Sequence, residues 1–341
     1  MEEALDLGLG DPRCTNAPGR EAQAAMEDLG SRVSKLVNGR ATVFSVDGCL
    51  ASAMAVLAAG RAARARGAGH VVASPVESAA VVGALRLLQE EGSRVSVMDS
   101  DRRGFVGPDS LGELLAEDTG LLVCCLADGV CGTVQPLKEL SGLLDPERTW
   151  VHCECSWAAG RVPVDMEELG VDSASFSSVQ LGGPPGSGAV TVRRGRMLSL
   201  DRVPEFALST NLPASFGMVA AMESRFGCVG TSSGYVEELR EETMRGLDSC
   251  GLSYSIIGGE GSLPGTGLLR LKGRFDRVHA RLEREGVILP SHNSTRRLSF
   301  LRRTGWDVSM PDRYLGFSLD TFNTGLDVEY FLRALASVLG S

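Results

Sequence analysis

Hydrophobic residues recur along the first part of the chain in two alternating patterns, one typical of strands and one typical of helices. Short apolar or β-branched runs, bounded by Gly, Asp, Ser or Pro, predict strands. Longer segments with apolar residues at helical spacing lie between them. The predicted strands are residues 41–46, 70–75, 94–100, 120–127, 149–155, 173–178 and 186–194. The predicted helices are residues 19–36, 49–63, 79–91, 110–117 and 134–144.

Strands that are apolar nearly throughout, each followed by a helix, are typical of a mostly parallel sheet with helices on both faces. Ligands of such sheets bind beyond the carboxyl ends of the strands. After about residue 204 the pattern changes to an α+β order. Helices are predicted at 214–225, 235–249, 275–285 and 326–339, with strands at 267–273 and 315–320. We therefore expect an α/β protein with an N-terminal segment and helix (1–40), a large domain (41–210) and a small C-terminal α+β domain (211–341).

Composition narrows the class of protein. Because 43% of the 341 residues are hydrophobic and 23% are charged, disordered and fibrous classes are excluded. No apolar run has the length of a membrane span, and the acidic N-terminus resembles neither a secretory signal nor a mitochondrial leader. We therefore expect a cytoplasmic protein whose nine cysteines are reduced. The net charge of −9 disfavours nucleic acid as a partner, and no membrane partner is expected.

Five stretches of the chain carry a resemblance to a known family. They are GREAQAAMEDLGSRVSKLVN, CGTVQPLKEL, VHCECSWAAGRVPVDMEELGVDSASFS, GGPPGSGAVTVRRG and LGFSLDTFNTGLDVEY. In content and order they resemble the cysteine desulfurase and selenocysteine lyase branch of the class V aminotransferases. The resemblance covers the chain from about Asp11 onward and implies a fold type I scaffold that uses pyridoxal phosphate (PLP). It also implies a dimer in which each active site is completed by the partner subunit.

The amine that PLP needs is missing from its expected place. PLP chemistry uses a lysine as nucleophile and proton shuttle. In the family this lysine precedes a Gly-Pro turn, and the corresponding residue here is Gln180. The chain has only three lysines, Lys35, Lys138 and Lys272, and none lies near this position in the pattern. Covalent binding of PLP is therefore not supported.

The resemblance places the remaining cofactor contacts at five positions. The phosphate-binding threonine falls at Cys49, after Gly48, and a phosphate-binding serine is kept as Ser177. The histidine that stacks on the ring falls at Ser78, and the carboxylate that pairs with the ring nitrogen falls at Glu154. Trp157 replaces a glutamine near the ring hydroxyl. The resemblance thus implies a vestigial PLP pocket of five residues: Cys49, Ser78, Glu154, Ser177 and Gln180. Glu154 is either a former cofactor ligand or an acid satisfied by local donors.

The substrate side of the family's site is also altered. The arginine that holds the substrate carboxylate falls at about Gly316. The catalytic cysteine belongs to a loop in the region 288–311, which contains no cysteine. Persulfide chemistry needs a thiolate at that place. No residue of the chain is therefore assigned a catalytic role.

Other polar groups have plainer interpretations. His152, on a predicted buried strand, is more typical of a hydrogen-bonded core residue than of a ligand. Cys153 and Cys155 alternate with Glu154 and should face away from it, so no metal site is expected from them with Cys49 and Cys131. Four arginines cluster in one segment and indicate a solvated surface or, alternatively, a contact with an acidic partner. They are Arg296, Arg297, Arg302 and Arg303.

The leading hypothesis is a cysteine desulfurase-like protein without catalytic activity, serving as a scaffold or regulatory subunit in sulfur transfer or iron–sulfur cluster metabolism. Its expected partners are a second copy, an active homologue in a heterodimer, or a sulfur-acceptor protein. The alternative is a PLP-dependent lyase or transferase that binds the cofactor non-covalently. A decaying paralogue without selected activity is a third possibility.

Overall fold

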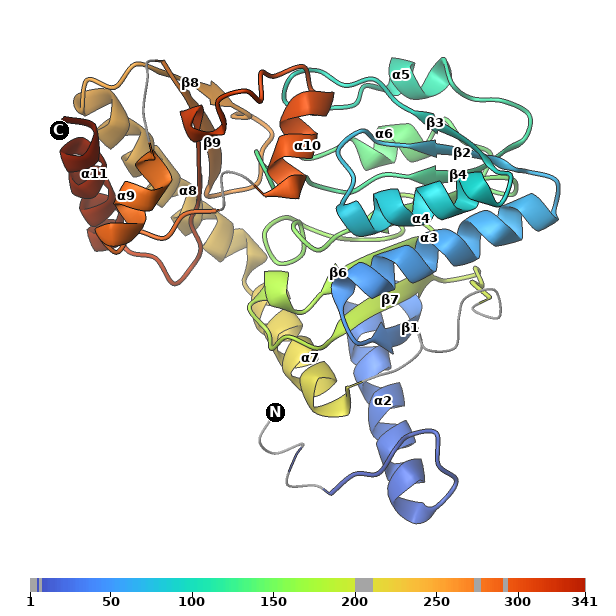
Figure 1. The fold of residues 1–341 in the computed structure, drawn as a ribbon. Helices are drawn as coiled ribbons and strands as arrows, with labels where there is room; N and C mark the ends of the chain where they lie inside the picture. The colour runs from blue at the N-terminus through green and yellow to red at the C-terminus, as the bar shows by residue number, and fades with distance from the viewer. Residues whose placement is uncertain (1–4, 6–7, 200–210, 273–276, 291–293, 341) are drawn as a thin grey trace. The chain divides into compact units, whose positions relative to one another are not determined.

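The computed structural model describes residues 5, 8–199, 211–272, 277–290 and 294–340 (Figure 1). The chain forms two compact units. The N-terminal unit comprises residues 1–99, 106–126 and 135–228, and the C-terminal unit comprises residues 100–105, 127–134 and 229–341. Within the described ranges, no helix has both the length and the apolar character that crossing a membrane requires.

A seven-stranded sheet forms the centre of the N-terminal unit, with strand order β1-β7-β6-β5-β4-β2-β3. The strands are β1 (Gly39–Ser45), β2 (His70–Ala73), β3 (Arg94–Val97), β4 (Thr119–Val123), β5 (Trp150–Glu154), β6 (Ser173–Ser177) and β7 (Gly188–Arg193). Neighbours from β6 to β3 pair in parallel, whereas β7 pairs antiparallel with both β6 and β1. The prediction of an α/β protein with a mostly parallel sheet is confirmed.

The helices of this unit follow the predicted order. They are α2 (Ala17–Leu36), α3 (Gly48–Ala65), α4 (Ala79–Glu90), α5 (Pro108–Gly112), α6 (Leu137–Ser141) and α7 (Leu212–Phe226). Two predicted helices, 110–117 and 134–144, are shorter than expected. The second starts only after Pro136, and Val134 before it forms a β-bridge with Ala127. Tertiary pairing therefore displaced the local helical preference.

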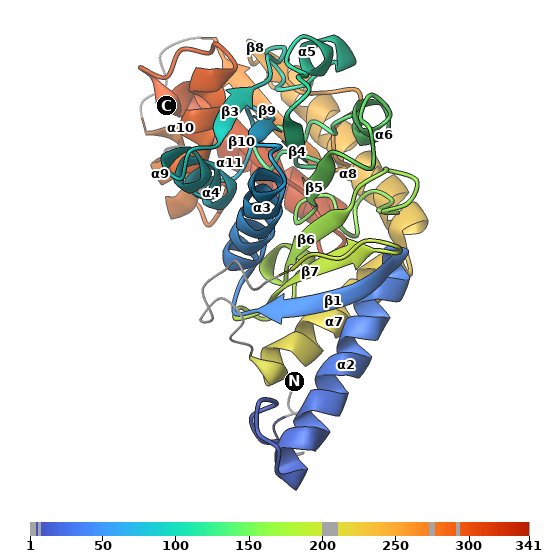
Figure 2. The ribbon, with the colours of Figure 1, turned by 90° about the vertical axis from the view of Figure 1, so that its right-hand side faces the viewer.

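Two side chains that follow one another on β7 show how the helices cover the sheet. Thr191 hydrogen-bonds Thr42, which in turn bonds Ser34 of α2, each at 2.8 Å. Val190 packs with Met54 of α3. Because successive side chains of a strand point to opposite faces, α2 and α3 lie on opposite faces of the sheet (Figure 2). Helix α4 packs on the α3 side through the apolar cluster that α3, α4, β2 and β4 share.

A buried carboxylate ties β5, β6 and the end of β7 together. Asp172 is 1% exposed, and its Oδ1 accepts hydrogen bonds from Arg193 (2.8 Å) and Arg196 (2.7 Å). Its Oδ2 accepts from the backbone N–H of Val151 at 2.8 Å. A buried charge is tolerated only when it is paired and hydrogen-bonded in this way.

The C-terminal unit is built on an antiparallel sheet of order β10-β9-β8. Its elements are α8 (Val229–Ser249), β8 (Tyr254–Ile257), β9 (Thr266–Leu271), α9 (Val278–Arg284), α10 (Thr295–Arg303), the 3₁₀ helix η3 (Pro311–Arg313), β10 (Tyr314–Ser318) and α11 (Gly325–Gly340). Leu269, Leu315 and Leu335 lie in its apolar core. Strand β8 and helix α10 were not predicted, and residues 273–276 of two predicted elements lie outside the described ranges.

We expect Asp172→Ala to lower the free energy of unfolding by about 3 kcal/mol, because it leaves two partly buried guanidiniums without their counter-ion. Urea denaturation of purified protein measures this loss. Asp118→Ala is the matched control, since Asp118 is 46% exposed in its ion pair with Arg94 and should cost less than about 1 kcal/mol. Equal losses in the two variants would contradict the structural role of Asp172.

Candidate functional site

The five residues of the predicted cofactor pocket lie along one edge of the N-terminal sheet. Strand β5 ends at Glu154 and β6 ends at Ser177, while Ser78 follows β2 at the start of α4. Because β1 and β6 are both antiparallel to β7, β1 runs in the direction of β6, and Cys49 follows it in the first turn of α3. Gln180 lies in the 3₁₀ helix η1 (Val179–Leu181), just after β6. The carboxyl ends of parallel strands therefore bring these residues to a common edge, as the topology predicted.

Two glycines let the start of α3 touch the ends of β6 and β7. A Cβ on Gly48 would lie 2.2 Å from the Cβ of Ser177. A Cβ on Gly188 would lie 2.3 Å from the carbonyl oxygen of Asp47. Contacts this short exclude any side chain at either position. Ser177 is therefore held directly beside the first turn of α3.

A buried chain of hydrogen bonds also holds α3 against β6 and β5. Ser52 of α3 bonds the carbonyl of Gly48 (3.0 Å) and the hydroxyl of Ser175 (2.8 Å). Ser175 also bonds Nε2 of His152 at 3.3 Å, and Nδ1 of His152 bonds Ser173 at 2.9 Å. Burial lowers the pKa of His152 to about 3. The ring is therefore neutral near pH 7, and His152 is a hydrogen-bonded core residue as its sequence position indicated.

The N-terminus of α3 already carries a negative charge. The side chain of Asp47 caps the helix by accepting from the N–H of Leu50 at 2.7 Å. Helix N-termini stabilise anions, but here the carboxylate of the chain itself occupies that role, and a phosphate would meet a like charge. Cys49, where the family has its threonine, is exposed. An Asp directly before a helix is a capping signal that can be seen in the sequence.

Ser78 has a local structural function. It caps α4 by accepting from the N–H of Val81 at 3.4 Å. Beside it, Glu77 is 7% exposed, and its Oε1 accepts from Ser74 and from the N–H of Cys125, both at 2.7 Å. Sequence reasoning did not identify Glu77. A carboxylate immediately before a helix cap was the available signal, but it did not reveal the burial.

The two remaining pocket residues, Glu154 and Gln180, each have side-chain oxygen atoms. Glu154 is 4% exposed, and its Oε1 accepts from the N–H of Ser156 at 3.0 Å. The buried Oε1 of Gln180 has no hydrogen-bond partner among the described residues. An amide cannot replace an amine as a nucleophile. Trp157, which the resemblance places near the ring hydroxyl, is half-buried.

Cys153 lies on β5, where strand alternation places its side chain on the face opposite to Glu154, and Cys155 follows the end of the strand. Their sulfurs are 3.4 Å apart, and both residues are fully buried. Burial is the main cause that raises the pKa of Cys153, so this thiol stays protonated. Across the residues the structure describes, no three His, Cys, Asp or Glu side chains are grouped closely enough to hold a metal ion.

The residues present do not fit covalently bound PLP. All three lysines are exposed: Lys35 on α2, Lys138 on α6 and Lys272 after β9. None of them belongs to the edge that carries Glu154 and Gln180. The capped start of α3 adds a charge that opposes phosphate. We therefore derive no reaction step through this cofactor.

In the C-terminal unit, the space beside Gly316 is filled by a side chain from another helix. The guanidinium of Arg297, from α10, lies against it, so that a Cβ on Gly316 would be 2.4 Å from Nη2 of Arg297. Arg297 is 3% exposed and donates from Nη1 to the carbonyl of Tyr314 at 3.3 Å. The prediction that Arg297 lies on a solvated surface is wrong. Its side chain fills the space that a residue at position 316 would need.

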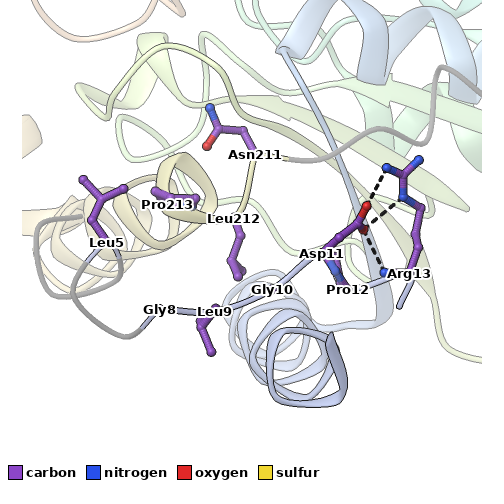
Figure 3. Close-up of a pocket in the computed structure, with 10 residues that line it drawn as sticks. All are labelled: Leu5, Gly8, Leu9, Gly10, Asp11, Pro12, Arg13, Asn211, Leu212 and Pro213. Carbon is purple, nitrogen blue, oxygen red and sulfur yellow. Dashed lines mark hydrogen bonds and ion pairs between the residues drawn. The ribbon is translucent and has the colours of Figure 1, made fainter. Parts of the chain in front are cut away.

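A pocket of about 530 Å³ in the N-terminal unit lies apart from the predicted residues (Figure 3). It is lined by Leu5, by residues 8–13 and by residues 211–213 at the start of α7. Its charged groups, Asp11 and Arg13, pair with each other at 2.8 Å. Since none of the five predicted site residues lines this pocket, it does not represent the family's cofactor site.

Comparison with known proteins agrees with the fold described above. The family model for aminotransferase class-V matches residues 5–205. The chain therefore belongs to the class V aminotransferases. Within that family it belongs to the cysteine desulfurase branch, as the relatives and the solved structures below support.

Two curated relatives are both cysteine desulfurases. IscS of Dictyoglomus turgidum is 31% identical over 197 residues, which are 57% of this chain and 50% of the relative. IscS 1 of Archaeoglobus fulgidus is 31% identical over 242 residues, which are 68% of this chain and 63% of the relative. The chain thus spans less than two thirds of the length of either relative.

Solved structures match over a longer range. A NifS-like protein superposes with a TM-score of 0.85 at 25% identity and covers 97% of this chain and 92% of its own. The protein DndA of Streptomyces lividans has a TM-score of 0.77 at 18% identity, over 94% of both chains, and shows the fold alone. These matches confirm the fold type I assignment.

We expect Gly188→Ala to destabilise the protein by about 2 kcal/mol or more, because the new methyl group meets rigid backbone at Asp47. The free energy of unfolding in urea is the measurement. Gly83→Ala is the control, since a Cβ on Gly83 of α4 meets nothing within 4 Å. That change should be neutral or add about 0.5–1 kcal/mol through helix propensity. Wild-type stability of Gly188→Ala would show that the strand end and α3 are not in contact.

The buried ring of His152 should make stability depend on pH. The folded protein takes up this proton only near pH 3, whereas the unfolded chain takes it up near 6.5. As the pH falls below about 6.5, protonation of this ring therefore favours the unfolded state. The free energy of unfolding falls by up to about 1.4 kcal/mol per pH unit from this group. Unfolding curves of the wild type and His152→Gln across this range measure the effect. Parallel pH profiles would contradict it.

Proposed function

We propose that this chain is a cysteine desulfurase-like protein without the family's catalytic activity, which acts as a scaffold or regulatory partner subunit in sulfur transfer or iron–sulfur cluster metabolism. The observation that carries the proposal is Gln180. It stands at the position of the family's Schiff-base lysine, and its buried Oε1 has no hydrogen-bond donor among the described residues. An amide at that point provides neither the nucleophile nor the proton carrier of the reaction.

The proposal is supported by a second loss that is independent of Gln180. The region 288–311, where the family has its catalytic cysteine, contains no cysteine. The cap at Asp47 works against the cofactor's phosphate as well. Three changes of different chemistry, to the amine, the thiol and the phosphate site, thus each disfavour the family's catalytic activity.

A scaffold role is supported by the contrast between the altered site and the intact fold. The N-terminal unit has a buried apolar core, and its buried Asp172 is paired with Arg193 and Arg196. Such a protein can still present the family's surfaces. We propose a cytoplasmic homodimer, or a heterodimer with an active homologue, that contacts a sulfur-acceptor protein. Purification from the native host as a monomer, with no such partner, would contradict this part of the proposal.

One observation favours the alternative of a PLP-dependent lyase or transferase with an altered site. The contact between Gly48 and Ser177 is kept, and Glu154 remains buried at the end of β5. These groups could hold the cofactor without a covalent bond. Saturable binding of PLP that is lost on Glu154→Ala would support this alternative.

We expect purified wild-type protein to show no saturable binding when titrated with PLP, and no phosphopyridoxyl adduct by mass spectrometry after borohydride treatment. The variant Gln180→Lys with Asp47→Ser should gain an adduct at residue 180, because it restores the amine and removes the opposing charge. Gln180→Met with Asp47→Ser is the control without an amine. An adduct on Lys35, Lys138 or Lys272 of the wild type would contradict the proposed loss of function.

A further inference from the structure

The C-terminal unit gathers guanidinium groups around one tryptophan, Trp306, which follows α10. The guanidinium carbons of Arg102 and Arg270 lie 4.9 and 5.7 Å from the centre of a ring of Trp306. The indole N–H donates to the carbonyl of Arg102 at 2.7 Å, and the backbone N–H of Trp306 bonds Leu301 at 2.7 Å. The ring is therefore held in place and stabilises two positive charges beside it.

Further aromatic and arginine side chains from β10, α10 and η3 belong to this group. Tyr314 packs edge-on against Trp306 with ring centres 6.5 Å apart, and it pairs with Arg270 between β10 and β9. Beneath it, Arg297 is bonded to the Tyr314 carbonyl. Burial lowers the pKa of Arg297 to about 10, so this group keeps its charge at neutral pH. Arg302 is exposed in the last turn of α10, and Arg313 ends η3.

We define the Trp306 patch as Trp306 with Arg102, Arg270, Arg297, Arg302 and Arg313. Within the part of the chain that the structure describes, none of these five arginines forms an ion pair. One acid beside them, Asp307, accepts from the N–H of Ser309 at 2.9 Å. Its pKa is lowered mainly by its hydrogen bonds with Ser309 and, to a smaller extent, by the charges of Arg313 and Arg270. A second acid, Asp312, precedes Arg313 in η3. Two carboxylates do not balance five guanidiniums, so the patch has a local excess of positive charge.

The chemistry of the patch favours carboxylates. Guanidinium groups bind carboxylates with paired, directional hydrogen bonds. A nucleic acid would also neutralise the charge, but single-stranded nucleic acids are held on open aromatic faces, and the ring of Trp306 already has two guanidiniums within 6 Å. The net charge of −9 on the whole chain also opposes a polyphosphate at long range. A short acidic polypeptide, by contrast, can be attracted by the local positive charge of the patch alone.

We propose that the Trp306 patch binds an acidic segment of a partner protein. The inference rests on the proposed role as a partner subunit and extends it by naming the chemistry of the partner. It also resolves the two interpretations left open for the arginines of α10. Arg297 is buried and donates to the carbonyl of Tyr314, while Arg102 and Arg302 are exposed and available for the contact.

The test uses the full-length protein and a fluorescein-labelled polyglutamate peptide, with binding followed by fluorescence anisotropy. We expect saturable binding by the wild type, weakened about tenfold or more in Arg102→Glu/Arg302→Glu. The matched control is Arg284→Glu/Arg333→Glu, which makes the same charge change at exposed positions of α9 and α11 and should bind as the wild type does. The thermal midpoint of each variant verifies that it is folded.

Three results would overturn the inference. They are an absence of saturable binding by the wild type, equal weakening in both double variants, and tighter binding of an oligothymidylate of the same net charge. Equal weakening would mean that net charge alone attracts the peptide, and the third result would assign the patch to nucleic acid. A parallel PLP titration separates this failure from failure of the proposed function, because saturable PLP binding would contradict the latter and leave the peptide result intact.

Discussion

The close approach of helix α3 to the ends of β6 and β7 is the constraint on which the rest of the N-terminal unit depends. Gly48 and Gly188 leave no space for a Cβ, so backbone lies directly against backbone and against Ser177. Van der Waals contacts of this kind, with no void between the elements, give protein interiors their density and rigidity. The buried bonds from Ser52 through Ser175 to His152 then orient the helix along the sheet.

The same constraint makes the chemistry of the site easy to interpret. Once the first turn of α3 is fixed, the nature of its cap decides what can bind there. A carboxylate cap satisfies an N–H of the helix and contributes roughly 1 kcal/mol to its stability. That carboxylate also places a negative charge where the family binds phosphate. At this helix terminus, stability of the fold and affinity for an anionic cofactor therefore oppose one another.

Two positions at which the chain differs from the family's pattern, Ser78 and Gly316, take part in local contacts of the fold. Ser78 caps α4, and Arg297 fills the space beside Gly316. Each substitution has a physical role in the element that carries it. Ser78 and Arg297 therefore each stabilise the elements with which they are in contact.

The parallel sheet and its edge could be predicted from the sequence because buried parallel strands are apolar nearly throughout and end at polar residues. The common edge of Glu154, Ser177 and Gln180 followed from that topology. Helix α10 could not be predicted, because four arginines in nine residues obscure its apolar periodicity, and one of them, Arg297, is buried. Glu77 was missed as well, since only the tertiary fold brings the N–H of Cys125 to its carboxylate.

By itself, the sequence determined which chemical groups this protein has: an amide at position 180, three lysines, and no thiol in the region 288–311. Covalent structure alone decides whether an amine or a thiolate exists. Only the tertiary structure decided how the remaining charges act. Burial and proximity set the cap at Asp47, the neutral ring of His152 and the cluster around Trp306, because electrostatic energies depend on distance and solvation, and neither can be read from the order of residues.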